Sequence, residues 1–287
     1  MSQSLQLRLL AAADLAYADS LRALVGWNQT LEDWRRFLAL EPTGCFLAEW
    51  EGQPAGTATT TVHESGLAWI GMVLVHPEYR RRGIGRALLN RCIAHLQDRG
   101  IQCTKLDATP QGKSVYEALG FKSEWSLTRW EHPAFCAKFP QPDSRLRSWR
   151  ATDPELVEAC DQAAFGVSRR KLLNALAALN GNTLILETAP GVATGFGMLR
   201  AGARALYLGP VAAASSPEGL AIVNALLARA PGARIFWDIP DANTDAVDWA
   251  RRHGFNPQRP LSRMVLGINI APGNPSQQFA LSGPETG

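Results

Sequence analysis

Residues 73–89 read Val73-Leu74-Val75-His76-Pro77-Glu78-Tyr79-Arg80-Arg81-Arg82-Gly83-Ile84-Gly85-Arg86-Ala87-Leu88-Leu89. An apolar strand is followed by a short basic turn that contains two glycines, and then by a helix. A helix N-terminus has unpaired backbone N–H groups and a partial positive charge. Each arginine adds charge-assisted hydrogen bonds of roughly 1.5–3 kcal/mol, and Gly83 and Gly85 let the backbone approach a phosphate closely. The stretch therefore predicts a site for a pyrophosphate-bearing ligand.

Two other kinds of phosphate-binding loop are excluded by the same residues. A dinucleotide-binding fingerprint needs a third glycine where Leu88 stands, and a P-loop needs Gly-Lys-Ser/Thr after the glycines. Neither pattern is present. The remaining alternative is an exposed basic turn that precedes an ordinary helix and binds nothing.

Length and composition limit the class of protein. A chain of 287 residues, 46% of them hydrophobic, suits one large or two medium domains with real cores. A net charge of +3 is weak for a nucleic-acid binder. The cysteines are odd in number and lack metal-ligand spacing, which predicts reduced thiols and no metal. They are Cys45, Cys92, Cys103, Cys136 and Cys160. No segment resembles a signal peptide or a membrane span, so we expect a cytoplasmic protein without membrane or nucleic-acid partners.

The order of predicted elements occurs twice along the chain. In the first half, strands are expected at 5–10, 45–50, 54–62, 67–75, 104–109 and near 125–130, and helices at 13–25, 31–40, 84–99 and 113–119. In the second half, strands are expected at 146–150, from 183, at 205–212 and at 234–239, and helices at 154–165, 169–179, 217–230 and 244–253. We predict an α+β fold of two tandem domains, each a mixed α/β sheet flanked by helices.

The boundaries of these domains are predicted from the prolines and glycines between the expected elements. We expect domains at 1–136 and 145–287, joined by a proline-containing linker at 137–144. Gly120-Phe121 and Gly254-Phe255 close equivalent helices, and each helix follows a strand that bears an aspartate, Asp107 or Asp238. The tail 272–287 has the composition of a loop, with 278–282 as a candidate edge strand of the second sheet.

The spacing Arg80-x-x-Gly83-x-Gly85 between a strand and a helix resembles the acetyl-coenzyme A motif of the GNAT superfamily of N-acetyltransferases. The resemblance covers nearly the whole first half. It implies that the strand before the turn separates from its neighbour, and that its backbone binds the pantetheine arm and polarises the thioester carbonyl. The acetyl-CoA site implied in this way consists of Val73, Leu74, Val75, Arg80, Arg81, Arg82, Gly83, Ile84, Gly85 and Arg86.

Tyr116 is the candidate general acid. It stands four residues before Gly120, where GNAT enzymes carry a tyrosine that protonates the leaving thiolate. A phenol with a pKa near 10 can hydrogen-bond sulfur and donate a proton as negative charge develops. The alternative is a tyrosine that packs its ring and exposes its hydroxyl.

The general base is left open by the sequence. Glutamate or histidine can take the amine proton through a water molecule. The candidates on or beside the central strands are Glu49, His63, Glu64 and Asp107. Solvated hairpin charges and a capped strand end explain each of them as well, so none is assigned.

The loop around Trp27 and Asn28 is the candidate acceptor pocket. In the superfamily that the sequence resembles, the loop between the first two helices commonly shapes that pocket. The alternative is that Trp27 anchors the loop in the core, while Asn28 or Thr30 caps the next helix.

The second half lacks the residues that carry the chemistry. After its central strand there is no Arg-x-x-Gly-x-Gly, Glu218 stands at the expected phosphate position, and Ala250 stands where Tyr116 does in the first half. It resembles the C-terminal domain of tandem GNAT proteins through Gly254-Phe255…Arg263-Met264. We expect a degenerate copy that packs on the first half, covers the acceptor cleft or forms a homodimer.

Together these features predict an acetyl-CoA-dependent N-acetyltransferase. It would transfer acetyl to the primary amine of a small molecule or peptide by direct attack in a ternary complex, without a cysteine nucleophile. One alternative is a non-catalytic acyl-CoA-binding or regulatory protein, which would not need Tyr116. Another is a structural module that binds a partner.

Overall fold

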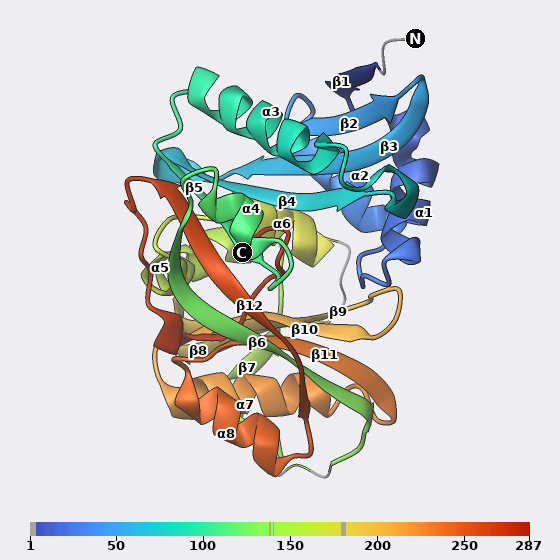
Figure 1. Cartoon of the computed structure of the whole chain (residues 1–287). Coiled ribbons are helices and arrows are strands. Elements are labelled where there is room, and N and C mark those ends of the chain that lie inside the picture. Colours follow the sequence, from blue (N-terminus) through green and yellow to red (C-terminus); the bar gives the residue numbers. More distant parts are fainter. Residues whose placement is uncertain (1–3, 138, 140, 179–181) are drawn as a thin grey trace.

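The strands of both halves form one continuous mixed sheet in the computed structural model, which describes residues 4–137, 139, 141–178 and 182–287 (Figure 1). Among these residues the sheet has 13 strands, ordered β1-β2-β3-β4-β5-β12-β6-β11-β10-β9-β8-β7, with β13 paired to β10. The strands of the first half are β1 (Leu5–Leu9), β2 (Cys45–Trp50), β3 (Gln53–Val62), β4 (Leu67–Val75), β5 (Cys103–Ala108) and β6 (Lys122–Phe135). Those of the second are β7 (Leu146–Ser148), β8 (Thr183–Ala189), β9 (Val192–Arg200), β10 (Leu206–Ala213), β11 (Ala233–Pro240), β12 (Asn256–Gly267) and β13 (Gln278–Ala280).

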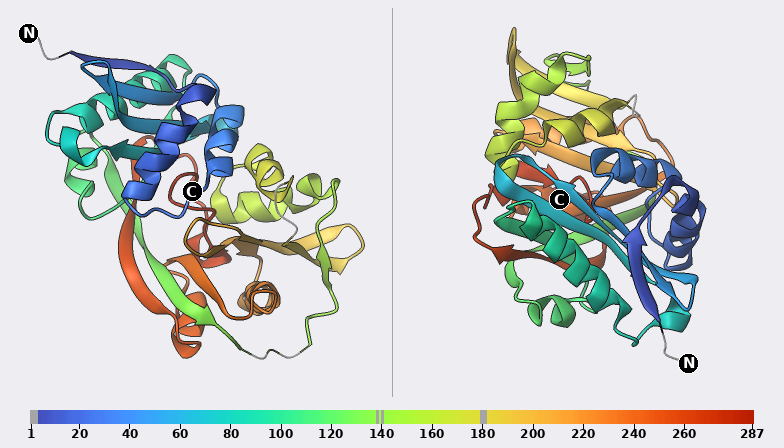
Figure 2. Two further views of the ribbon diagram at one scale, coloured as in Figure 1. Left: turned by 90° about the vertical axis from the view of Figure 1, so that its right-hand side faces the viewer. Right: turned by 90° about the horizontal axis from the view of Figure 1, so that it is seen from above.

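Helices cover both faces of the sheet in each half (Figure 2). The helices are α1 (Leu15–Leu24), α2 (Leu31–Leu40), α3 (Ile84–Asp98), α4 (Lys113–Glu117), α5 (Asp153–Phe165), α6 (Arg170–Ala178), α7 (Ser216–Leu227) and α8 (Thr244–Arg252). Alternation along β2 shows how the faces are built: Phe46 packs in the core under α3, whereas Leu47 packs in the core under α1 and α2. In the second half, α7 and α8 cover one face and α5 and α6 the other. The predicted α+β fold of two similar halves is confirmed.

Most predicted elements are present, but β12 at 256–267 corresponds to no predicted strand. The helix at 31–40 and the strand at 67–75 have the expected ends. Residue 179 of the predicted sixth helix, residues 138 and 140 of the predicted linker and the first three residues of the chain lie outside the described residues. Within the described range, no helix combines the length and hydropathy that a membrane crossing requires.

The last long strand of each half lies against the other half. The strand predicted near 125–130 is present as β6, but it pairs with β11 and β12 of the second half. Instead, β12 lies beside β5, with Arg263 opposite Asp107. Figure 1 shows β6 and β12 as long neighbouring strands that run from one half into the other. Each half is therefore completed by chain from its counterpart.

Two buried ion pairs hold the exchanged strands in matching ways. Arg263 on β12 donates two hydrogen bonds to the carboxylate of Asp107 on β5, at 2.9 and 3.0 Å. Arg129 on β6 does the same to Asp238 on β11, at 2.7 and 2.6 Å. All four side chains are at most 4% exposed. The repeated Gly-Phe…Arg pattern of the sequence is thus the pattern of a strand that reaches an aspartate in the opposite half.

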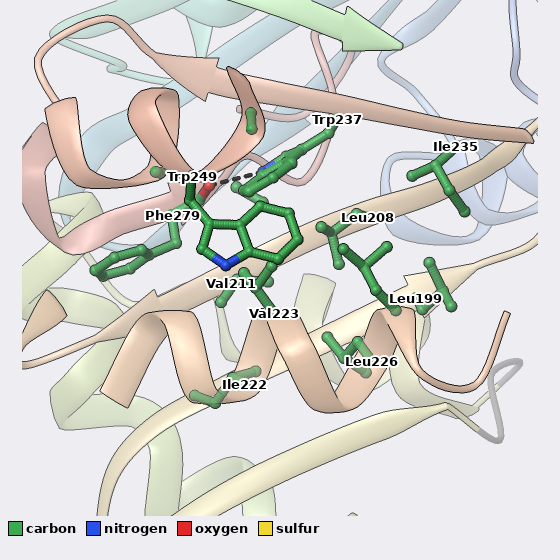
Figure 3. Packing of buried hydrophobic residues seen from close by; sticks show 14 of the residues in the cluster. Leu199, Leu208, Val211, Ile222, Val223, Leu226, Ile235, Trp237, Trp249 and Phe279 are labelled. Atoms are coloured by element: carbon green, nitrogen blue, oxygen red, sulfur yellow. Dashed lines mark hydrogen bonds between the residues drawn. The ribbon is translucent and has the colours of Figure 1, made fainter. Parts of the chain in front are cut away.

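The segment after β12 fills the middle of the molecule. The prediction of an edge strand at 278–282 is wrong, because the strand that forms there, β13, lies inside the second half beside β10. β13 pairs antiparallel with β10, and the N–H of Leu281 donates to the carbonyl of Asp238 on β11 at 3.0 Å. The indole of Trp237 donates to the carbonyl of Phe279 at 2.8 Å, as Figure 3 shows. Residues 281–287 then continue toward the first half, and the last residue lies between the two halves (Figure 1).

Candidate active site

Strands β4 and β5 diverge at the centre of the first half. They pair in parallel only from Leu67 to Trp69, opposite Cys103 to Lys105, although β4 continues to Val75. On its other side, β4 stays paired with β3, and a register shift accompanies the left-handed backbone of Met72 (φ 49°). The predicted separation of the strand is confirmed. Among the described residues, it leaves one backbone edge of Val73–Val75 without a strand partner.

The basic turn leads from this strand into α3 in a constrained conformation. Arg81 and Gly83 have φ values of 61° and 80°, and for Gly83 this left-handed backbone is the reason that glycine is favoured. No side chain caps the helix, whose first backbone bond runs from Ala87 to the carbonyl of Gly83 at 3.0 Å. The N–H groups of the first helical turn are therefore free to bind an anion.

A groove runs along this turn. Its walls come from the end of β4, the turn, the start of α3 and α4. They include Val75, Tyr79, Arg80, Arg81, Gly83, Ile84, Gly85 and Arg86, together with Ser114, Val115 and Ala118. Most of the predicted cofactor residues thus line one continuous groove, and α4 joins them as its opposite wall.

Tyr116 lies on α4 between this groove and a second cavity. Its ring meets Phe121 edge-on at 6.1 Å between centroids, and it approaches Gly112 so closely that a Cβ there would lie 2.9 Å from the ring. Burial, with a smaller contribution from Cys92, raises the pKa of Tyr116 to about 12. The phenol is therefore a neutral hydrogen-bond donor at physiological pH.

The second cavity, of about 150 Å³, begins where β4 and β5 diverge. Both halves of the chain contribute to its walls. They are formed by Trp27, Gln29, Ile70, Gly71, Met72, Val73, Leu106, Asp107, Thr109, Gly112 and Tyr116 from the first half, and by Arg259, Leu261, Pro284 and Glu285 from the second. Val73 and Tyr116 connect this cavity to the cofactor residues, so it has the location of an acceptor pocket.

The two candidate acceptor residues have different surroundings. Trp27 lines the cavity. Asn28 lies beside it, and its amide is bonded to the second half: it accepts from the N–H groups of Arg204 and Ala205 and donates to the carbonyl of Ala205. Thr30 begins α2, with its hydroxyl accepting from the N–H of Asp33 at 3.3 Å. Asn28 therefore joins the two halves next to the pocket, and Thr30 is the helix cap.

Of the four candidate bases, Asp107 is the one that lines the cavity. Burial raises the pKa of its carboxyl, against the opposing effect of Arg263. Glu49 pairs with Arg8 at 2.8 Å on the outer strands. His63 packs against Phe165, and burial lowers the pKa of its imidazole to about 3. Glu64 lies with His63 at a separate cavity.

Gln29, Glu285 and Arg259 line the cavity but were not among the predicted site residues. Glu285 is 6% exposed and accepts a hydrogen bond from the side chain of Gln29 at 2.7 Å. Burial raises the pKa of Glu285. Arg259 lies on β12, and its pKa is lowered to about 10, chiefly by burial.

Gly71, inside an apolar strand, was the one local sequence signal, and it concerns the approach of Glu285 alone. The backbone of Glu285 lies so close to Gly71 that a Cβ there would be 2.5 Å from its carbonyl oxygen. Trp69 on the same strand donates to the carbonyl of Pro284 at 3.0 Å. A glycine inside a strand marks a close backbone approach, but it does not say which segment approaches.

The second half has the same divergence, but its own chain fills it. β10 and β11 pair in parallel from Leu206 to Leu208 and then separate, and β13 occupies the gap. Phe279 packs against Gly219 in the first turn of α7, so that a Cβ on this glycine would overlap the ring. Glu218 in the same turn accepts hydrogen bonds from Thr194 and Ser215, both at 2.8 Å. The position equivalent to the cofactor groove is therefore closed.

A parallel strand pair that separates beside a helix N-terminus is typical of a class of acyl-transferring enzymes. Comparison with family models assigns the chain to such a class. Residues 14–121 match the model described as acetyltransferase (GNAT) family, and residues 157–280 match the model described as acetyltransferase (GNAT) domain. Together the two matches cover most of the chain. The chain belongs to the GNAT family of acetyltransferases and contains two GNAT domains.

Relatives with assigned names share part of their length with this chain. The uncharacterized N-acetyltransferase YitH of Bacillus subtilis is 32% identical over 190 residues, which are 66% of each protein. A mycothiol acetyltransferase of Thermobispora bispora is 36% identical over 113 residues, or 35% of this chain and 36% of that one. The chain thus spans about two thirds of the first relative and about a third of the second.

Solved structures extend the likeness in fold to the whole chain. A putative acetyltransferase from Pyrococcus horikoshii has a TM-score of 0.84 at 23% identity, covering 100% of this chain and 97% of that chain. A tandem GNAT protein from the clavulanic acid biosynthesis pathway has a TM-score of 0.62 at 16% identity, covering 92% and 98%. At these identities the comparison concerns the fold alone.

Proposed function

We propose that this protein is an acetyl-CoA-dependent N-acetyltransferase in which residues 1–136 hold the donor and residues 145–287 complete the acceptor side. The observation that carries the proposal is the meeting of three features in one half. The unpaired edge of β4, the free N-terminus of α3 and the phenol of Tyr116 lie around a groove and a cavity to which β4 and α4 both contribute walls. In the second half, β13 fills the equivalent gap.

The residues present fit acetyl-CoA as the donor. The turn at Arg80–Arg86 would bind the pyrophosphate through the first N–H groups of α3 and the arginine side chains. The backbone of Val73–Val75 would bind the pantetheine arm, and one of its N–H groups would stabilise the oxyanion that forms on the acetyl carbonyl.

The transfer needs no covalent intermediate on the protein. The amine nitrogen loses a proton and attacks the acetyl carbonyl carbon, and the C–N bond forms as the C–S bond breaks. Tyr116 donates its proton to the leaving sulfur. The ammonium form of the acceptor loses two protons in all: one balances the proton gained by sulfur, and the other passes to solvent.

Screening a panel of primary amines for consumption of acetyl-CoA by the full chain tests this proposal. We expect transfer to at least one class of small amine or peptide. Tight binding of acetyl-CoA without transfer to any amine would instead support a non-catalytic acyl-CoA-binding protein.

Introducing an acidic residue at the start of α3 should abolish donor binding. In Gly85→Asp the carboxylate would face the pyrophosphate, and juxtaposed like charges cost several kcal/mol, so we expect the affinity to fall more than about a hundredfold. Calorimetric titration with acetyl-CoA should give one site for the wild-type chain and no detectable site for the variant.

Gly85→Ala is the matched control, because it adds the Cβ without the charge. That Cβ would lie 3.6 Å from the side chain of Val75, an ordinary contact. Stability should be unchanged or slightly higher in Gly85→Asp, because acidic residues are favourable at a helix N-terminus. Equal affinities of the two variants would contradict the proposed pyrophosphate site.

The pH dependence of kcat should show no falling limb below about pH 10.5. Burial raises the pKa of Tyr116 to about 12, so the phenol keeps its proton over this range. An acid must be protonated to act, and its loss therefore appears only as pH approaches its pKa. Initial rates between pH 6 and 10.5 measure this, and a falling limb with an apparent pKa at or below 9 would show that another group is the acid.

A further inference from the structure

We propose that the acceptor is a small primary amine that also carries an anionic group, with Glu285 and Gln29 binding its amine and Arg259 binding its anion. This inference rests on the proposed function and specifies the substrate class of the same site. All three residues line the cavity that begins at Val73 and Tyr116. Two of them, Arg259 and Glu285, come from the degenerate half.

The end of the cavity that contains Glu285 presents hydrogen-bond acceptors. The Nε2 of Gln29 donates to Oε2 of Glu285 at 2.7 Å, which fixes the orientation of the amide. The Oε1 of Gln29 is then left buried without a hydrogen-bond partner, in a side chain that is 8% exposed. Buried acceptors without partners are costly. A carboxylate and an amide oxygen side by side are the groups that an ammonium or amine nitrogen would satisfy.

Arg259 presents the opposite chemistry. Its guanidinium forms no hydrogen bond or ion pair with any described residue, and its Nε is buried without a partner. It lines the same cavity as Glu285, yet no guanidinium nitrogen of Arg259 lies within 4.0 Å of a carboxylate oxygen of Glu285. A largely buried, unpaired guanidinium is unfavourable, and a bound carboxylate or phosphate would supply the bidentate partner that it lacks.

The size and the walls of the cavity favour a small molecule as the occupant. Its volume is about 150 Å³; Pro284 and Glu285 form part of its wall, and Trp27 and Leu261 add apolar surface. A small compound that carries both an amine and a carboxylate or phosphate would give Glu285 and Arg259, which line the same cavity, a partner of opposite charge each.

Matched pairs of acceptors test the anionic group directly. The full chain is assayed with L-amino acids against the corresponding decarboxylated amines, and with O-phosphoethanolamine against ethanolamine. We expect the anionic member of at least one pair to have the higher kcat/KM. The pair in which this occurs distinguishes a carboxylate from a phosphate.

Arg259→Met should reduce kcat/KM about 10- to 100-fold for the anionic member of that pair, because a charge-assisted bond is lost. The member that lacks the anionic group should not lose activity. Arg259→Lys, which retains the charge, should recover part of the loss, and it also serves if the methionine variant is unstable. Arg229→Met, on an exposed arginine at the end of α7, is the matched control and should change neither rate.

Glu285→Gln should lower kcat/KM for both members of a pair, because both carry the amine. An equal loss for both members in Arg259→Met, or no preference for the anionic member in the wild type, would overturn this inference while leaving acetyl transfer intact. If no amine is acetylated although acetyl-CoA binds, the proposed function fails, and the inference fails with it.

Discussion

Tyr116→Phe is expected to lower kcat by about 10²- to 10⁴-fold, the range typical for loss of a positioned general acid. Without the phenol, the thiolate must leave unprotonated or take its proton from water. The change removes one oxygen atom and keeps the ring, which packs against Phe121 and over Gly112. Rates at saturating acetyl-CoA and amine measure the effect.

Two further measurements separate loss of the acid from loss of structure. No described residue forms a hydrogen bond with the hydroxyl of Tyr116, so the melting temperature of Tyr116→Phe should match that of the wild type. Its affinity for acetyl-CoA, measured by calorimetry, should change by about fivefold or less, since a single neutral hydrogen bond is worth about 1 kcal/mol or less. A variant that keeps the wild-type kcat would show that the proton comes from elsewhere.

The strand–turn–helix unit of the proposed donor site could be predicted from the sequence because it is local. The strand, the turn and the helix at 67–98 follow one another directly, and the turn needs glycine at position 83 for its left-handed backbone. Tyr116 follows from its spacing to Gly120. Such short-range patterns determine the geometry of a strand–turn–helix unit without information about the rest of the fold.

The strand exchange could not be predicted in the same way. The alternation of residues along a strand indicates which face is buried, but not which strand lies beside it. Because the two halves repeat one pattern, β6 and β12 are equally suited to pair with β5. Arg129 and Arg263 occupy matching positions, and each pairs with the aspartate of the other half.

The acceptor side could not be predicted either, because distant segments build it. Gln29 and Glu285 are hydrogen-bonded although most of the chain separates them. The tail had been expected to be a loop or an edge strand, and nothing near Glu285 in sequence indicates a buried carboxylate. Its position depends on β13, which enters the gap between β10 and β11 and carries the following residues to Gly71.

These contacts give the degenerate half a physical role. It supplies β12 to the sheet that contains the cofactor groove, and Arg259 and Glu285 to the cavity beyond it. Its own gap, filled by β13, fixes the path of the tail. The second half therefore contributes both a strand and part of a cavity wall to the first.

Arg129→Met is expected to destabilise the whole chain by about 3–5 kcal/mol, the usual cost of removing one partner of a buried ion pair. Asp238 would keep the hydrogen bond from Tyr207 at 2.9 Å but would lose both bonds from the guanidinium. Because β6 pairs with β11 and β12, both halves should unfold in one transition. Urea unfolding followed by fluorescence and circular dichroism measures the loss.

The exposed pair Arg251–Asp248 provides the matched control, since its side chains are both 63% exposed. Arg251→Met should cost less than about 1 kcal/mol, as is usual for surface pairs. A similar loss in both variants would mean that the exchanged strands do not depend on their ion pair.

The loss of stability in Arg129→Met should depend on pH, because the pKa of Asp238 changes when its partner is removed. Burial acts to raise the pKa of Asp238, but Arg129 and the hydrogen bonds overcome it, so the pKa is lowered from its ordinary value of 3.8. The wild-type carboxylate therefore contributes stability above pH 3.8, which is lost as pH falls through the lowered pKa. In Arg129→Met burial dominates and the pKa rises, so the buried charge is costly at high pH and is relieved by protonation. The free energy of unfolding that Arg129→Met loses relative to the wild type should thus be larger at pH 8 than at pH 5. A loss that grows toward acid pH would contradict this account of the pair.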